Sequence, residues 1–150
     1  MPYTEAFIME AQRLGNVVPL GVGHAATHDL EFAGYRFPKV GMMFQANVWS
    51  CHMDPKFWPD PEKFDPGRFL NSDGSLKTKV PSFLPFVLGK RQCLGESLAR
   101  MELFLFLAIF MQIFTFRTTT GSALLKAEDV DNFIVNSPKH FQFLLEERKQ

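Results

Sequence analysis

The residue best placed to do chemistry in this 150-residue sequence is Cys93. It stands in a glycine-containing loop before a predicted helix, within the segment Phe86-Val-Leu-Gly-Lys-Arg-Gln-Cys-Leu-Gly95. A helix N-terminus carries partial positive charge, and the neighbouring Lys90 and Arg91 add to it. The pattern therefore favours a thiolate, which is the form of cysteine that acts as a nucleophile or a metal ligand.

The residues around Cys93 suit a large, flat ligand. Gly89 and Gly95 remove side-chain bulk, so a planar group could approach the backbone near the sulfur. Phe86 supplies an apolar wall, and Arg91 supplies a cation for a carboxylate of the ligand.

A single thiolate points to haem rather than zinc. Zinc takes three or four protein ligands in one neighbourhood, and the four histidines have no Cys-x-x-Cys partner set. A porphyrin brings four equatorial nitrogens and needs only an axial ligand. Without this pattern, a lone cysteine is more often a small buried hydrophobe, which is the interpretation favoured for Cys51.

A second pattern lies near the start of the sequence, at Glu10 and Arg13. The i, i+3 spacing places both side chains on one helix face, where they can interact. Such a pair alone is typical of a solvated surface contact worth under about 1 kcal/mol. An apolar stripe on the same predicted helix puts Glu10 at its border and favours partial burial; the stripe consists of Tyr3, Phe7, Ala11 and Leu14.

The segment ending at Gly95 resembles the haem-binding signature of the cytochrome P-450 superfamily, Phe-x-x-Gly-x-Arg-x-Cys-x-Gly, and matches it at every fixed position. The resemblance implies that Cys93 is the axial thiolate ligand of haem b. It further implies that Arg91 pairs with a haem propionate and that Phe86 packs beside the sulfur.

Glu10-Ala-Gln-Arg13 resembles the Glu-x-x-Arg motif on the K helix of that superfamily. The family completes this pair with an arginine from a proline-rich meander, and Pro66-Gly-Arg-Phe69 resembles that segment, with Arg68 as the third member. Gly67 stands where many members carry glutamate. The implied role of the triad is structural, because it would hold the meander under the haem loop.

Three further assignments follow from the resemblance. His24 stands where related animal enzymes place a residue on the second haem propionate; without the resemblance, it reads as an ordinary satisfied histidine. Residues after the first helix would line the substrate cavity: Val17, Val18, Leu20 and Val22. Phe133 and Ile134, in the turn 132–137, would also reach the cavity, although the turn reads equally well as an ordinary hairpin end.

Hydrophobic periodicity and turn residues predict a mainly α fold with small β-hairpins, an α+β arrangement. In family terms this is a K helix, short sheet strands, the meander, the cysteine loop, an L helix and a terminal hairpin. The expected ranges are a helix through Leu14, a hairpin 30–37, a strand 40–44, a short helix 46–51, an irregular meander 55–85, a helix from about Leu94 to Phe114, and a hairpin pairing 133–135 with 141–145.

The composition excludes several classes of protein. With 46% hydrophobic and 21% charged residues, the sequence is neither collagen-like nor intrinsically disordered. Sixteen basic residues balance sixteen acidic ones, so no overall field attracts nucleic acid, and no nucleic-acid partner is expected. Two cysteines are too few for a disulfide scaffold. The charge-free run 103–116 is shorter than the about 20 residues of a spanning helix, so no membrane span is expected.

The long predicted helix is apolar nearly all round, and seventeen phenylalanines need more interior than these elements can enclose. The resemblance covers about the last third of the family's usual chain. We therefore expect residues 1–150 to be the C-terminal haem-binding portion of one larger cytochrome P-450 domain, with the N-terminal membrane anchor and the I helix outside this sequence.

The resemblance, closest to the microsomal animal enzymes of family 2, implies a haem-thiolate monooxygenase that inserts one oxygen atom of O2 into a small apolar substrate. An NADPH-dependent flavoprotein reductase would supply electrons, with cytochrome b5 as a second donor, at the cytoplasmic face of the endoplasmic reticulum membrane. No catalytic residue beyond the haem ligand is expected in these 150 residues, which would be inactive alone. The alternatives are a truncated product without activity and a haem-binding, gas-sensing or interaction module without turnover.

Overall fold

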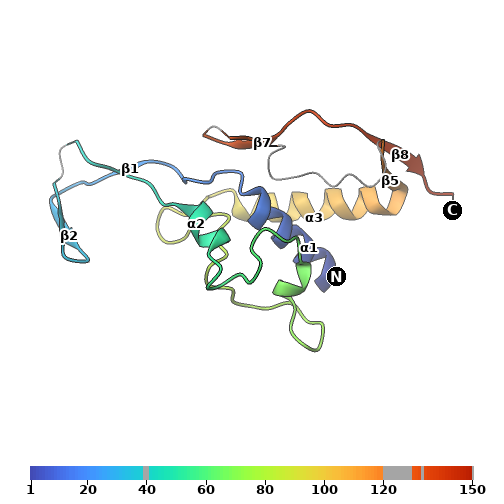
Figure 1. Cartoon of the computed structure of the whole chain (residues 1–150), viewed down its shortest axis with the longest axis horizontal. Helices are drawn as coiled ribbons and strands as arrows, with labels where there is room; N and C mark the ends of the chain where they lie inside the picture. The colour runs from blue at the N-terminus through green and yellow to red at the C-terminus, as the bar shows by residue number, and fades with distance from the viewer. Residues whose placement is uncertain (39–40, 120–129, 133, 150) are drawn as a thin grey trace.

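The computed structural model describes residues 1–38, 41–119, 130–132 and 134–149 (Figure 1). The elements, in chain order, are α1 (Pro2–Gly15), β1 (His24–Ala25), β2 (Leu30–Phe32), β3 (Tyr35–Phe37), β4 (Met43–Phe44), α2 (Val48–Met53), the 3-10 helix η1 (Pro66–Phe69), α3 (Glu96–Ile113), β5 (Phe114–Thr118), β6 (Val130–Asn132), β7 (Asn136–Pro138) and β8 (Phe143–Glu147). The α+β class predicted from the sequence agrees with this arrangement.

Helix α1 ends at Gly15, one residue beyond the predicted Leu14. Pro2 lies at the first helical position, where its missing N–H costs nothing. Asn16 follows the last turn in the left-handed conformation, and its backbone N–H donates to the Gln12 carbonyl at 2.9 Å. This residue closes the helix in the way that an asparagine at this position can.

The expected burial of the apolar stripe on α1 was wrong. Its buried residues are Ala6, Glu10 and Arg13, whereas Tyr3 is 62% and Phe7 38% exposed. The charged pair faces inward because it meets further polar partners there. The stripe is left on the outer side of α1 in this chain.

The hairpin predicted at 30–37 is confirmed. Strands β2 and β3 pair antiparallel, with Leu30 opposite Phe37. Ala33 and Gly34 connect them with φ of 52° and 79°, the two positive values that a tight type I′ turn requires. The next strand, β4, is shorter than the predicted 40–44 and pairs with β1; residues 39–40 lie outside the described ranges. Helix α2 begins two residues later than predicted, where the Asn47 side chain accepts the Ser50 N–H.

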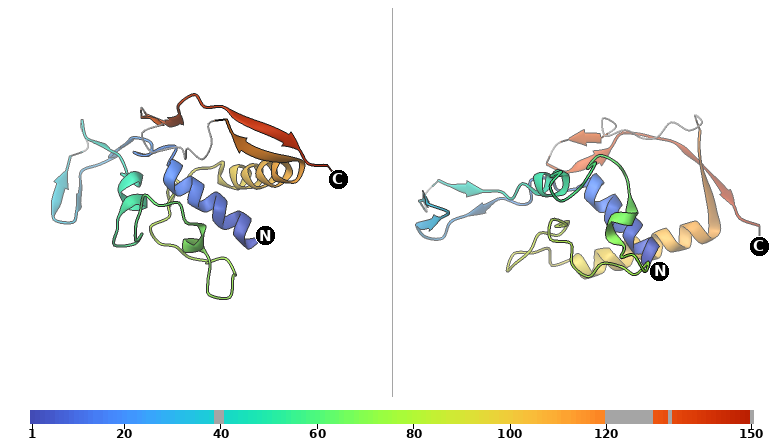
Figure 2. Two further views of the ribbon diagram at one scale, coloured as in Figure 1. Left: turned by 45° about the vertical axis from the view of Figure 1, so that its right-hand side comes forward. Right: turned by 60° about the horizontal axis from the view of Figure 1, so that its bottom comes forward.

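The proline-rich meander is ordered, as predicted, and packs on α1. Figure 2 shows α1 between η1 on one side and α3 on the other, and α1 contacts both. Trp58 and Phe69 are 2% and 0% exposed and form a small core with Ala6. Burial does not extend to every meander aromatic, since Phe57 and Phe64 are 55% and 43% exposed.

Helix α3 is largely uncovered by the described part of the chain. None of its eighteen residues is buried. Its exposed large side chains lie on all sides: Leu98, Met101, Leu103, Leu105, Phe106, Ile109, Phe110, Met111 and Ile113.

The predicted C-terminal hairpin was wrong. Strand β8 pairs instead with β5, which puts Phe143 opposite Thr118, while the short strands β6 and β7 pair with each other. The long helix ends at Ile113, one residue before the predicted Phe114, and the next residues form β5, which we did not expect. The sequence Phe-Thr-Phe-Arg-Thr alternates aromatic and polar residues with the period of a strand. Residues 120–129 and 133 lie outside the described ranges.

Replacing Phe69 by alanine should destabilise the protein by about 3–5 kcal/mol, because it empties the centre of the small core. Urea denaturation would measure the change in the free energy of unfolding. Phe57→Ala is the matched control, because that ring is more than half exposed, and should change stability by about 0.5 kcal/mol or less. Equal losses in both variants would contradict this account of the core.

Candidate functional site

The loop that carries Cys93 is closed by its own backbone. The Cys93 N–H donates to the Phe86 carbonyl at 3.0 Å, and the Gln92 N–H donates to the Gly89 carbonyl at 3.1 Å. Val87 and Gly89 have positive φ, 59° and 86°. For Gly89 this conformation is free of strain, so the glycine of the signature also matters for the turn itself.

Cys93 lies two residues before the N-cap of α3. Cys93 is a free, exposed cysteine, and Gly95, the N-cap of α3, offers no side chain to the first helical N–H groups. A Cβ atom at Gly95 would lie 3.9 Å from the Cys93 Sγ. A side chain at position 95 would therefore lie next to the sulfur and occupy space that a flat ligand would need.

These features fit an axial thiolate of haem. Within the described ranges, no three or more His, Cys, Asp or Glu side chains converge as a metal-binding group. Haem iron can take one cysteine as its protein ligand, whereas zinc needs three or four protein ligands. Phe86 is partly buried beside this loop, and the Arg100 guanidinium lies 5.2 Å from its ring centroid.

The two propionate candidates lie on different elements. Arg91 is exposed in the cysteine loop. His24 is exposed on β1, where it pairs with Phe44 of β4. Their contacts with haem stay predictions.

The predicted substrate residues after α1 are largely open, from 36% exposure at Val18 to 72% at Val22. The C-terminal region reaches this segment, because the Asn136 N–H donates to the Val17 carbonyl at 2.8 Å. The Asn136 side chain also donates to the Asn16 carbonyl at 3.0 Å. The structure thus brings two of the predicted pocket segments to one place. Ile134 is exposed there, and Phe133 lies outside the described residues.

Glu10 and Arg13 form a fully buried, bidentate ion pair. The Arg13 Nε donates to Glu10 Oε2 at 2.7 Å, and Nη2 donates to Oε1 at 2.8 Å. Both side chains are 0% exposed, so the pair is not the solvated contact that the isolated pattern most often makes. The remaining Nη1 donates to the His52 carbonyl at 2.8 Å.

Arg68 approaches the same carboxylate from the meander. Its Nε lies 3.3 Å from Glu10 Oε1, and its terminal nitrogens donate to the carbonyls of Pro59, Asp60 and Lys63. Glu10 also accepts the Asp65 N–H at 2.9 Å. The three charged residues of the predicted triad, Glu10, Arg13 and Arg68, are therefore in contact. Hydrogen bonds to backbone groups further balance their charge.

The departure at Gly67 has a local reason. The Asp65 side chain caps η1 by accepting the Gly67 N–H at 2.9 Å. A Cβ atom at position 67 would lie only 2.9 Å from Asp65 Oδ1. Glycine therefore suits this form of the meander while leaving Arg68 in place.

His52 is the residue of this region that the sequence interpretation missed. Its imidazole is 0% exposed, stacks on Phe83 with 5.8 Å between ring centroids, and accepts the Leu84 N–H on Nε2 at 2.9 Å. Because Nε2 accepts, the ring proton is on Nδ1, which has no hydrogen-bond partner among the described residues. Burial, together with the Arg13 guanidinium, lowers the pKa of His52 from 6.5 to about 4. No motif marked this histidine, since the predicted short helix ended at Cys51.

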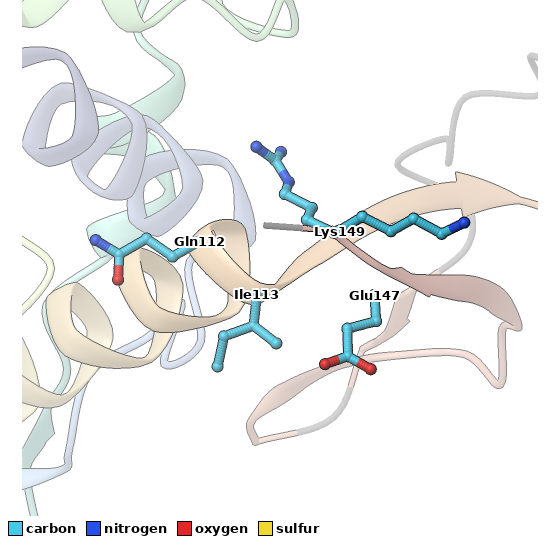
Figure 3. Close-up of a pocket in the computed structure, with 5 residues that line it drawn as sticks. Gln112, Ile113, Glu147 and Lys149 are labelled. Carbon is cyan, nitrogen blue, oxygen red and sulfur yellow. The ribbon is translucent and has the colours of Figure 1, made fainter.

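A hollow at the other end of α3 has no link to these residues. It is lined by Gln112, Ile113, Glu147, Arg148 and Lys149, where the helix meets the end of β8 (Figure 3). Most of helix α3, whose eighteen residues span about 27 Å, lies between this hollow and the cysteine loop.

Glu10→Gln should lower the free energy of unfolding by about 3–5 kcal/mol, because it leaves buried Arg13 and Arg68 without their carboxylate. Glu5→Gln is the control on the same helix, since Glu5 is exposed and pairs only loosely with the N-terminus, at 3.9 Å. Chemical denaturation of both variants tests the cluster. A cost at Glu10 no larger than at Glu5 would contradict it.

Stability should also fall in acid through His52. The unfolded imidazole takes up a proton near pH 6.5 and the folded one only near pH 4, so the unfolded state binds more protons between these values. This contribution is complete above pH 6.5 and is lost as the pH falls towards 4, by at most about 3 kcal/mol. The free energy of unfolding, measured by chemical denaturation across this pH range, should depend less on pH in His52→Gln than in the unmodified protein. An identical pH dependence in the two proteins would rule the contribution out.

In the described part of the chain, no helix has the length and apolar character needed to cross a bilayer.

Comparison with known proteins agrees with the signature. A family model described as Cytochrome P450 matches residues 1–145. Cytochrome P450 2L1 of Panulirus argus is 41% identical over 149 residues, and Cytochrome P450 2U1 of Rattus norvegicus is 50% identical over 122 residues. These alignments cover 99% and 81% of this chain but 30% and 23% of those proteins. Cytochrome P450 2C3 of Oryctolagus cuniculus is 44% identical over 142 residues, 95% of this chain and 29% of its own length.

The chain thus spans less than a third of the length of the curated relatives it matches. The family model nevertheless covers almost every residue, including the loop of Cys93 and the buried cluster of Glu10. This chain belongs to the cytochrome P450 family.

Proposed function

We propose that this chain carries the haem-ligand loop of a haem-thiolate monooxygenase, the complete protein inserting one oxygen atom of O2 into a small apolar substrate. The observation that supports it most is the free, exposed residue Cys93, just before the N-terminus of α3 and inside a complete family signature. When bound, thiolate-ligated haem supplies the O2 activation that monooxygenation needs.

Each residue of the loop would have a distinct task. Cys93 would hold the iron through its thiolate, and Phe86 would shield one side of the sulfur. Gly89 and Gly95 would leave room for the porphyrin edge. Arg91, with His24 from β1, would neutralise the propionates. The orientation and the charge come from the protein, while the reactivity belongs to the cofactor.

The buried cluster would act at a distance from the haem. Glu10, Arg13 and Arg68 join α1 to the meander, and the meander leads directly into the cysteine loop. We assign them a structural role, the holding of this loop. The segment 17–22 and the turn 132–137 would border the substrate, consistent with the hydrogen bond between Asn136 and Val17.

The partners follow from the family. Lys90 and Arg91 are exposed beside the cysteine, which suits docking of an acidic surface of an NADPH-dependent flavoprotein reductase or of cytochrome b5. The relatives of family 2 favour the endoplasmic reticulum membrane, cytoplasmic side, as the location of the complete protein. Residues 1–150 would form the C-terminal, haem-binding part of its single P450 domain.

The alternative is a haem-binding or interaction module without turnover, or an inactive product. Haem uptake by the 150-residue chain without reductase-driven turnover would favour a module. No haem uptake would favour the inactive product.

Cys93→Ala, made in the complete protein, should abolish the red-shifted band that thiolate-bound haem gives with carbon monoxide after reduction. The reason is that alanine offers no axial ligand. Cys51→Ala is the matched control, because that cysteine is half-buried on α2 and its backbone carbonyl, which the substitution retains, accepts the Trp58 indole Nε1–H. A thiolate-type spectrum that persists in Cys93→Ala would refute the ligand assignment.

A further inference from the structure

We propose that His52 is a positioning residue for the haem-ligand loop: it ties the base of that loop to the buried cluster of Glu10, Arg13 and Arg68. The inference rests on the proposed function, because it concerns the loop that would carry the thiolate. It assigns a role to a residue outside the signature and outside the triad.

The first step is the connection on the cluster side. The His52 carbonyl accepts the Arg13 Nη1 at 2.8 Å, and Arg13 is held in turn by both oxygens of Glu10. All three side chains are 0% exposed. The backbone of His52 is therefore fixed relative to α1.

The second step is the connection on the loop side. The His52 Nε2 accepts the Leu84 N–H at 2.9 Å, and the ring lies nearly parallel to Phe83, at 26°. The Leu84 carbonyl accepts the Val87 N–H at 3.1 Å, and the Phe86 carbonyl accepts the Cys93 N–H at 3.0 Å. One continuous series of hydrogen bonds and covalent links thus runs from Arg13 to Cys93.

The third step concerns why position 52 carries a histidine, since packing against Phe83 alone would not require one. A phenylalanine could fill the same space and stack on Phe83. The imidazole instead leaves a buried Nδ1 proton without a partner, which is unfavourable. What offsets this unsatisfied proton is the hydrogen bond on the other ring nitrogen. Nε2 accepts the backbone N–H of Leu84, which would otherwise lose its partner. The choice of histidine is therefore explained by the acceptor and not by ring volume.

The surroundings of the His52 ring also disfavour protonation of Nε2, which would remove the acceptor. Its charged neighbour is the cation Arg13, which disfavours a second positive charge on the ring, and the Glu10 carboxylate is already engaged by the two arginines. The neutral tautomer with a free Nε2 lone pair is consequently the form that the surroundings stabilise.

The test compares His52→Phe, which keeps the stacked ring and removes the acceptor, with His52→Gln, whose Oε1 can accept in place of Nε2. In the complete protein, reduced and exposed to carbon monoxide, His52→Phe should lose at least half of its thiolate-type band at unchanged haem content. His52→Gln should restore most of it. His28→Phe, at an exposed histidine of the β1–β2 connection, is the matched control and should behave like the unmodified protein.

Hydrogen exchange in the haem-free protein gives an independent readout. The Leu84 amide should exchange at least tenfold faster in His52→Phe than in the unmodified protein, while amides of α1 keep their rates. Unchanged Leu84 protection together with an unchanged thiolate-type band would overturn the inference. Equal loss of protection in α1 and at Leu84 would also overturn it, since the residue would then support the fold in general. If the unmodified protein gave no thiolate-type band, the proposed function would fail, and the exchange rates would still decide the role of His52.

Discussion

The interaction on which the middle of this structure depends is the burial of one carboxylate, Glu10, between two guanidinium groups. Removing such charges from water costs several kcal/mol per ion, and only pairing and further hydrogen bonds recover it. Here Arg13 and Arg68 pair with Glu10, and backbone groups complete their hydrogen bonds. Because these partners come from α1, α2 and the meander, the cluster joins three segments, of which α1 and the meander also share a small apolar core.

The buried cluster and the exposed cysteine have complementary tasks. In the proposed role, Cys93 would present its sulfur to haem, so it could not be held by burial of its own side chain. The loop is instead held by the backbone hydrogen bond between Cys93 and Phe86 and by the hydrogen bond between Leu84 and His52. In that role, groups that do not touch the ligand would hold the ligand-binding loop in place.

Much apolar surface of this chain lies outside any core that the chain itself forms. Helix α3 has no buried residue, and the stripe of α1 that includes Tyr3 and Phe7 is exposed. Local periodicity specifies both helices, but it cannot specify a covering partner. The cluster of Glu10 remains buried under these conditions because its partners are all contained within residues 1–69.

The sequence by itself determined the features that depend on near neighbours. The turn of Ala33 and Gly34, the extent of α1 and the spacing around Cys93 follow from local conformational preferences and fixed intervals along the chain. Only the tertiary structure decided which face of α1 is buried, that β5 pairs with β8, and that His52 reaches Leu84 across thirty-two residues. The physical reason is that burial and strand pairing are set by which distant groups compensate one another, and a local pattern such as the stripe of Tyr3 and Phe7 contains no information about them.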